Sequence, residues 1–130
     1  MEKKLGHARS FRELEVYKQS RELSRIIFEL TKNFPKEEKY SLTDQMRRSS
    51  RSIGAQIAEC WGKRRYENHF ILKITDSDSE QYETQHWIEV SFECEYIDEN
   101  IKSDLITKCE AIGKMLNSMI EKASLFCQKA

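Results

Sequence analysis

The motif with the clearest capacity for metal binding is Glu83-Thr84-Gln85-His86, an E-x-x-H sequence. A carboxylate and an imidazole at this spacing can bind one metal ion. Di-iron helix bundles use two such motifs, together with one glutamate from each of two other helices. The present sequence contains only this one E-x-x-H. We therefore interpret Glu83 and His86 as surface or interface residues, and we predict no metal site.

The acids that follow Thr75 have the alternating spacing of a calcium-binding loop, with Asp76, Asp78 and Glu80 as its first ligands. Such a loop also needs a glycine at its sixth position and a glutamate at its twelfth. Gln81 and Trp87 occupy those positions. The sequence therefore predicts no calcium site.

The three histidines, His7, His69 and His86, are the remaining candidates for acid–base catalysis. The sequence contains no glycine-rich phosphate loop, no nucleophile elbow and no converging Ser/His/Asp set around them. We therefore expect no catalytic residues, no cofactor and no enzymatic activity. A metalloenzyme is the least favoured of the functions considered.

Charges separate along the chain although the totals balance, with 22 basic and 22 acidic residues. Within residues 46–65 the basic side chains face only Glu59, whereas within residues 74–104 the acids face only Lys102. Two interpretations stay open: a basic surface for nucleic-acid phosphates, or arginines that pair with carboxylates of another helix or subunit. Aromatic residues are not interleaved with these arginines, which argues against reading single-stranded sequence. The candidate nucleic-acid-binding residues are Arg47, Arg48, Arg51, Lys63, Arg64 and Arg65.

Helical spacing places Arg47, Arg48 and Arg51 within about a quarter turn of one another, and residues 63–65 extend this patch past the helix end. Arg47 also lies beside a strip of small residues. For Arg47 we therefore keep a second interpretation, an ion pair with a carboxylate of the third helix.

Composition favours helices and one domain. The 130 residues include one proline and four glycines among 34% charged residues, so helix-breaking residues are few. A chain of this length buries one core. We expect a flexible N-terminus over residues 1–9 and one domain over residues 10–127.

Apolar periodicity predicts the first two helices. The first begins at Ser10, whose hydroxyl caps it while Glu13 reaches back in a capping box, and Pro35 ends it. The second ends at Gly62, where glycine favours a left-handed stop. Its apolar arc consists of Leu42, Met46, Ser49, Ile53, Ile57 and Cys60.

Two further helices are predicted over residues 66–97 and 102–126, separated by the polar residues 98–100. Short connections place successive long helices antiparallel and side by side. The expected fold class is therefore all-α, an antiparallel up-down-up-down four-helix bundle.

Two features favour self-association. The third helix carries more apolar surface than one core requires, including Trp87. The second carries Ser50, Gly54 and Ala58 at i, i+4 and i+8, a strip that permits close backbone approach, either within one subunit or between copies. The candidate oligomer-interface residues are Ser50, Gly54, Ala58 and Trp87.

Nothing in the sequence indicates export or membrane insertion. The first eleven residues lack an apolar stretch, and the longest strongly apolar run covers only residues 26–28. The cysteines show no C-x-x-C spacing, so we expect buried free thiols in a reducing cytoplasm. The cysteines are Cys60, Cys94, Cys109 and Cys127.

Residues 45–59, QMRRSSRSIGAQIAE, with Phe34-Pro35 before and Gly62-Lys63-Arg64 after, resemble the four-helix bundle family of the 23S rRNA intervening-sequence proteins, also described as S23-like. Residues 73–80, KITDSDSE, and 83–87, ETQHW, are similar to the third helix of one branch of that family. Residues 112–116, IGKML, are similar to its fourth helix. The resemblance covers residues 11–126. Two departures are Gln56, where asparagine is usual, and Cys60, where glycine usually follows the glutamate.

The resemblance implies a bacterial up-down bundle that assembles into a ring, typically a homopentamer, with no catalytic residues. It also implies a link to RNA. The expectation that follows is a non-catalytic homo-oligomeric scaffold that binds RNA or a nucleoprotein through its basic surface. The alternative is a protein–protein interaction scaffold that binds no nucleic acid.

Overall fold

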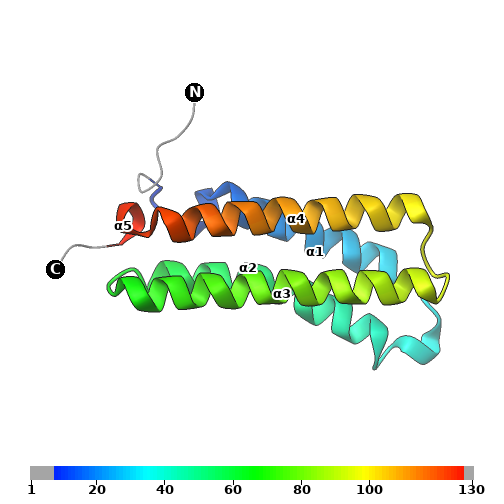
Figure 1. Cartoon of the computed structure of the whole chain (residues 1–130). Coiled ribbons are helices and arrows are strands. Elements are labelled where there is room, and N and C mark those ends of the chain that lie inside the picture. The colour runs from blue at the N-terminus through cyan, green and yellow to red at the C-terminus, as the bar shows by residue number, and fades with distance from the viewer. Residues whose placement is uncertain (1–7, 128–130) are drawn as a thin grey trace.

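The computed structural model describes residues 8–127, and all regular secondary structure within them is helical. The long helices are α1 (Glu15–Thr31), α2 (Leu42–Gly62), α3 (Glu67–Glu93) and α4 (Glu99–Glu121). Short 3-10 helices, η1 (Phe11–Glu13) and η2 (Lys36–Glu38), precede α1 and α2, and α5 (Ala123–Phe126) follows α4. Figure 1 shows the long helices running alternately in opposite directions. The predicted up-down-up-down bundle is confirmed. Within residues 8–127, no helix combines the length and the apolar character that crossing a membrane requires.

The long helices form a four-cornered bundle in which α1 and α3 each pack against both α2 and α4. The core lies where their buried stripes meet, and the predicted arc of α2 is confirmed, since all of its residues are buried. In α3 and α4 the buried positions recur at alternating steps of four and three residues, the spacing of left-handed helix packing. The stripes of α1 and α4 consist of Val16, Ser20, Leu23, Ile27 and Thr31, and of Leu105, Cys109, Ile112, Gly113, Leu116 and Met119.

The start of the first helix differs from the prediction. Ser10 does act as a cap, because its Oγ accepts the backbone N–H of Arg12 at 3.2 Å, but the segment that it caps is η1. The Glu13 carboxylate accepts the N–H of Arg9 at 2.8 Å, and not that of Ser10 as a capping box requires. Leu14 is extended, and α1 begins only at Glu15.

The end of α2 falls at Gly62, as predicted, but without the predicted left-handed glycine. Gly62 is the last helical residue, and Lys63 follows as the C-cap with φ −102° and ψ 11°. The helix therefore ends at a residue with negative φ, a backbone conformation that lysine adopts without strain.

The connection between α3 and α4 lies earlier in the chain than predicted, because α3 ends at Glu93 and α4 already begins at Glu99. Glu95 adopts a left-handed conformation with φ 64°. The N–H groups of Glu95 and Tyr96 bond to the carbonyl oxygens of Phe92 and Ser91, each at 2.9 Å, the Schellman pattern in which glycine usually occupies the left-handed position. The Asp98 side chain then caps α4.

The buried stripe of α3 is largely polar, and this explains its unusual apolar pattern. Ser77 Oγ donates to the Ile53 carbonyl at 2.9 Å, and Thr84 Oγ1 lies 2.9 Å from Ser49 Oγ. No buried side-chain nitrogen or oxygen among the described residues lacks a hydrogen bond. The additional apolar residues Trp87, Val90 and Phe92 lie at the edges of the stripe, partly buried against the same core, and Tyr96 packs against that core from the segment after α3.

Candidate nucleic-acid interface

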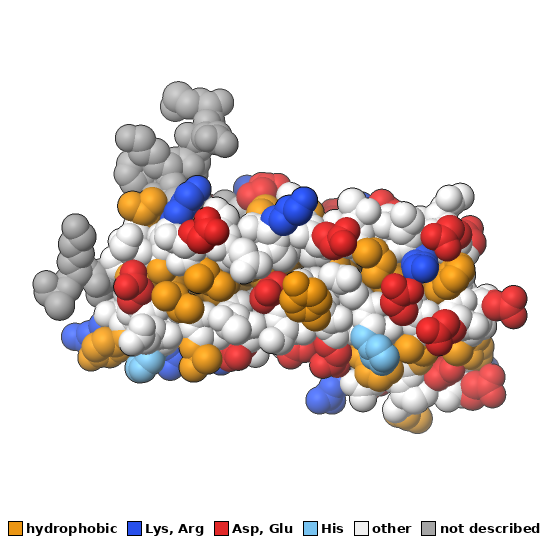
Figure 2. Space-filling view, viewed as in Figure 1, with side chains coloured by type: hydrophobic (Ala, Val, Ile, Leu, Met, Phe, Trp, Pro, Cys, Tyr) orange, Lys and Arg blue, Asp and Glu red, His pale blue; other side chains and the backbone are white. Residues whose placement is uncertain are grey.

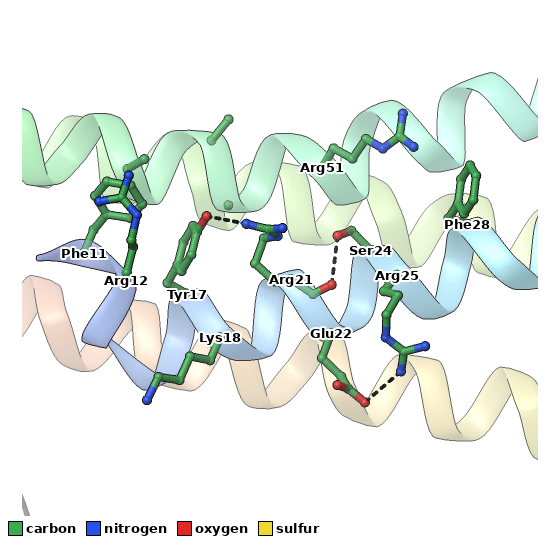
Figure 3. A pocket seen from close by; sticks show the side chains of 13 residues that line it. Phe11, Arg12, Tyr17, Lys18, Arg21, Glu22, Ser24, Arg25, Phe28 and Arg51 are labelled. Atoms are coloured by element: carbon green, nitrogen blue, oxygen red, sulfur yellow. Dashed lines mark hydrogen bonds and ion pairs between the residues drawn. The ribbon is translucent and has the colours of Figure 1, made fainter.

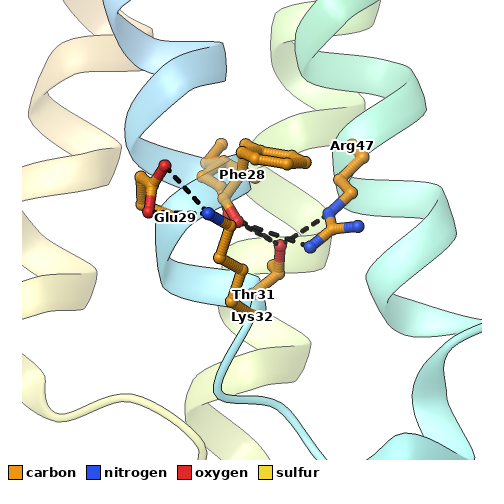
Figure 4. A network of polar contacts seen from close by, with 6 residues as sticks. Phe28, Glu29, Thr31, Lys32 and Arg47 are labelled. Carbon is orange, nitrogen blue, oxygen red and sulfur yellow. Dashed lines mark hydrogen bonds and ion pairs between the residues drawn. The ribbon is translucent and has the colours of Figure 1, made fainter.

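Arg47, a member of the predicted basic patch, is held against α1. Its Nε donates to Thr31 Oγ1 at 2.8 Å, and its guanidinium carbon lies 4.6 Å from the centre of the Phe28 ring. One terminal nitrogen donates to the Phe28 carbonyl at 3.4 Å. Figure 4 shows this network between the end of α1 and the beginning of α2. The predicted alternative, an ion pair with a carboxylate of the third helix, is wrong within this chain.

Arg64 is also held by its own chain. Its guanidinium lies 3.7 Å from the centre of the Trp61 ring, and its Nε donates to the Trp61 carbonyl at 2.8 Å. Lys63 and Arg65 are exposed beside it, and Arg65 lines a shallow hollow at the start of α3. This end of the patch therefore offers two free cations and one fixed one.

Arg48 and Arg51 are exposed in the N-terminal half of α2. At about 1.5 Å per residue, roughly 18 Å of helix separates Arg51 from Lys63. The predicted patch is thus two clusters. Within residues 8–127, no carboxylate forms an ion pair with any of its six members.

A groove of about 820 Å³ lies between α1 and α2 and contains Arg51. Its α2 side consists of Arg51 and three small residues, Gly54, Ala55 and Ala58. In Figure 3 the groove is seen along α1, and the side chains of Tyr17 and Phe28 extend from α1 toward α2. The groove is therefore open along α2, where most of the lining side chains are small, and it is lined by aromatic rings along α1.

The groove is basic. Arg12, Lys18, Arg21 and Arg51 line it without a carboxylate partner among the described residues, whereas Arg25 pairs with the single acid, Glu22, at 3.5 Å. Figure 3 shows Arg21 directed toward α2, whereas Lys18, Glu22 and Arg25 extend from α1 away from α2. The inner wall therefore carries cations, and the only carboxylate lies on the rim.

Each inner arginine lies over an aromatic ring. The guanidinium carbon of Arg12 is 4.5 Å from the centre of the Phe11 ring, and that of Arg51 is 5.4 Å from Phe28. Arg21 lies 5.7 Å from Tyr17 and donates to its hydroxyl at 2.8 Å. The sequence indicates no interleaved aromatic residues among the predicted arginines, but in the fold Phe28 of α1 lies against both Arg47 and Arg51.

Sequence reasoning missed the half of the groove that α1 and η1 supply, namely Arg12, Lys18, Arg21 and Arg25. A signal was present, because Tyr17, Arg21, Ser24 and Phe28 follow steps of four, three and four residues on one face of the helix. It was hidden because α1 also carries Glu15, Glu22 and Glu29, which mask the basic face in a count of charges.

The strip of small residues packs inside the chain. Ser50 and Gly54 are buried, and a Cβ atom added to Gly54 would lie 3.0 Å from Ser20 Oγ and 3.7 Å from Tyr17 Cε1. Of the two interpretations, close approach within one subunit is the one that the structure contains for Ser50 and Gly54. Ala58 and Trp87 are only partly buried, and their place in an oligomer interface stays a prediction.

The E-x-x-H motif lies on the outside of α3. Glu83 and His86 are exposed; Glu83 Oε2 accepts the indole N–H of Trp87 at 3.0 Å, and the His86 ring contacts the same indole, with centres 4.7 Å apart. Residues 8–127 contain no cluster of three or more potential metal ligands. Asp78, from the calcium-like spacing, accepts a hydrogen bond from Gln81.

The cysteines differ in exposure. Burial raises the pKa of Cys60 and of Cys109 to about 12, so these thiols stay protonated near neutral pH. Cys127 is partly buried, and Cys94 is exposed at the end of α3. The expectation of four buried thiols is therefore wrong for Cys94 and only partly met by Cys127.

The opposite side of the bundle is acidic. Figure 2 shows carboxylates scattered over the face of α3 and α4, most densely where α3 ends and α4 begins. Exposed acids there include Glu89, Glu93, Glu95, Asp98, Glu99 and Asp104. Ion pairs between helices on this side use Lys73 with Glu59 and Lys102 with Glu89, each at 3.3 Å. The charge separation along the sequence thus becomes a separation between faces.

The chain matches a known protein family over most of its length. The family model described as 23S rRNA-intervening sequence protein matches residues 12–118, which include all of α1, α2 and α3 and most of α4. The chain belongs to that family. The resemblance seen in the sequence is confirmed, and the family match spans both walls of the groove from Arg12 to Ala58.

A solved structure supports the same assignment. The structure of this chain is similar to the crystal structure of a protein of unknown function from the S23 ribosomal protein family of Bacteroides thetaiotaomicron. The TM-score is 0.73, and the two sequences are 31% identical. The match covers 82% of this chain and 95% of that chain. A search of curated proteins gave no significant match.

Proposed function

We propose that this member of the 23S rRNA-intervening sequence family is a non-catalytic, homo-oligomeric scaffold, a pentamer, that binds RNA or a nucleoprotein through the basic surface of α1 and α2. It works in the cytoplasm and needs no cofactor. The observation that carries the proposal is the set of groove cations without a carboxylate partner among residues 8–127, namely Arg12, Arg21 and Arg51 inside the groove and Lys18 at its rim. Cations without carboxylate partners are free to displace the counterions of a phosphate backbone.

Symmetry would strengthen such contacts. A ring presents the same groove once in each subunit, so phosphate contacts that are weak singly add to a useful avidity when one RNA reaches several of them. Recognition of this kind depends on phosphate charge and is largely indifferent to base sequence. We therefore expect tight binding at low salt and a steep loss of affinity as salt increases.

The test compares the wild-type protein with the double variant Arg21→Gln, Arg51→Gln. Labelled RNA is titrated at several salt concentrations, and the logarithm of affinity is plotted against the logarithm of salt. Removing two phosphate contacts should reduce the steepness of that slope by ~1.4, about 0.7 for each contact with single-stranded RNA. The matched control is Lys114→Gln, Lys122→Gln, two exposed lysines of α4 and its C-terminal end, which should leave the slope unchanged.

Equal slopes for the parent and the double variant would contradict the basic-surface assignment. No RNA binding by the parent at low salt would favour the second candidate, a scaffold that binds other proteins. The acidic face of α3 and α4 is the observation that supports this alternative, because it offers a large charged surface that could not contact phosphates.

A further inference from the structure

We infer that the α1–α2 groove accepts a single-stranded segment of nucleic acid, with bases stacked on its rings and on the arginines that lie over those rings. This inference rests on the proposed RNA-binding function and adds the form of the nucleic acid and the residues that contact its bases. Phosphate contacts alone would give a single strand no advantage over a duplex, whereas the aromatic wall of the groove favours the single strand.

The first argument is the repeated pairing of rings with guanidinium groups. Arg12 with Phe11, Arg21 with Tyr17 and Arg51 with Phe28 form three such pairs along one groove. A guanidinium plane held over a ring offers a flat, charged surface, and unpaired bases stack on both aromatic rings and arginine planes. The pairs therefore combine a stacking surface with a phosphate contact.

The second argument is the shape of the groove. Gly54, Ala55 and Ala58 keep the α2 wall low, and the open volume of about 820 Å³ is in the range of sites that hold small ligands. Tyr17 and Phe28 are separated along α1 by about 16 Å, at ~1.5 Å per residue. A strand that runs along the groove could reach both rings. A duplex keeps its bases stacked on each other and could contact only the rim.

The third argument is charge. The inner cations lie beside the rings, whereas the only carboxylate of the groove, Glu22, extends from α1 away from α2 and is paired with Arg25. A base and its own phosphate would therefore meet a ring and a free cation in the same place. An acidic peptide would satisfy the cations but would leave the stacking surfaces without planar partners.

The experiment uses three fluorescently labelled probes of equal length: a 12-nucleotide oligo(U), the same backbone without bases, and a 12-base-pair RNA duplex. Binding to the full chain is measured by anisotropy at low salt. The oligo(U) should bind at least ~5-fold more tightly than the abasic strand, the gain expected from stacking one base. Tyr17→Leu and Phe28→Leu should each reduce oligo(U) affinity by a similar factor and leave abasic affinity unchanged. The matched controls are Tyr66→Leu and Tyr82→Leu, which remove exposed rings outside the groove.

The outcomes separate this inference from the proposed function. Equal affinities for oligo(U), abasic strand and duplex, with both ring variants like the parent, would overturn the inference and leave phosphate binding intact. Absence of binding by every probe would overturn both. Displacement of oligo(U) by a 12-residue polyglutamate at equal concentration would show an acidic-peptide site and overturn the inference. Circular dichroism melts of Tyr17→Leu and Phe28→Leu confirm that lost affinity does not reflect unfolding.

Discussion

Two arginines one helical turn apart, Arg47 and Arg51, contact the same ring of Phe28 but have different surroundings. Arg47 is partly buried and bonded to Thr31, whereas Arg51 is exposed and lies in the groove. The first joins the end of α1 to α2, and the second is available to a ligand. We therefore expect these two neighbouring arginines to differ in role, with Arg47 structural and Arg51 part of the proposed binding surface.

Replacing Arg47 tests this division. Arg47→Gln should lower the free energy of unfolding by ~1 to 3 kcal/mol, because the hydrogen bonds from its charged group to Thr31 and Phe28 are lost. Arg51→Gln, the matched variant, should change stability by less than ~0.5 kcal/mol and should weaken RNA binding more than Arg47→Gln does. Urea unfolding followed by circular dichroism gives the first comparison, and the RNA titration gives the second. Equal stability of the two variants would contradict the structural role of Arg47.

At the scale of helices, α2 was predictable and α3 only in part. Burial of an apolar side chain contributes more than ~1.5 kcal/mol, so the regular apolar positions of α2 identify its inner face from sequence alone. The inner face of α3 uses Ser77, Gln81 and Thr84, whose partners lie on other turns and helices. Similarly, a left-handed Glu95 follows the end of α3, and the sequence has no glycine at this position to indicate that conformation.

The contact between α1 and α2 depends on the absence of a side chain at Gly54. Gly54→Leu should destabilise the fold by ~1 to 3 kcal/mol, because the new atoms meet Ser20 and Tyr17 at close range. Gly62→Leu is the control, since a Cβ atom there has no neighbour within 4 Å, and better helix propensity should make it neutral or stabilising by up to ~1 kcal/mol. Thermal melts of both variants make the comparison. Unchanged stability of Gly54→Leu would show that α1 can move away from α2 at little cost.

At the scale of the whole molecule, the bundle has a basic groove on one side and an acidic face on another. Of the predicted basic patch, only Arg51 lines the groove, because closeness in sequence does not place the other members on the same face. The α1 half of the basic side was not predictable, because its cations alternate with acids along the chain and only the helix separates them in space. Net charge, which is zero, conceals this arrangement.

Assembly is the prediction that belongs to this scale. Light scattering of the wild-type protein should give a mass that is a multiple of 15.5 kDa, five times for a pentamer. Trp87→Glu should lower that mass while far-ultraviolet circular dichroism stays unchanged, because the partly exposed indole lies outside the buried stripe of α3. Tyr82→Glu, at a mostly exposed position on the same helix, is the control. A monomeric wild type at micromolar concentration would contradict self-association.

The differing exposure of the thiols provides a way to measure that assembly. Cys94 stands in solvent at the end of α3, while Cys60 and Cys109 are buried and stay protonated. With Cys127 replaced by serine, a maleimide spin label would attach at Cys94 alone among residues 8–127. In a closed ring of identical subunits, such labels occupy the corners of a regular polygon. The ratios of the label-to-label distances would then report the number of subunits directly.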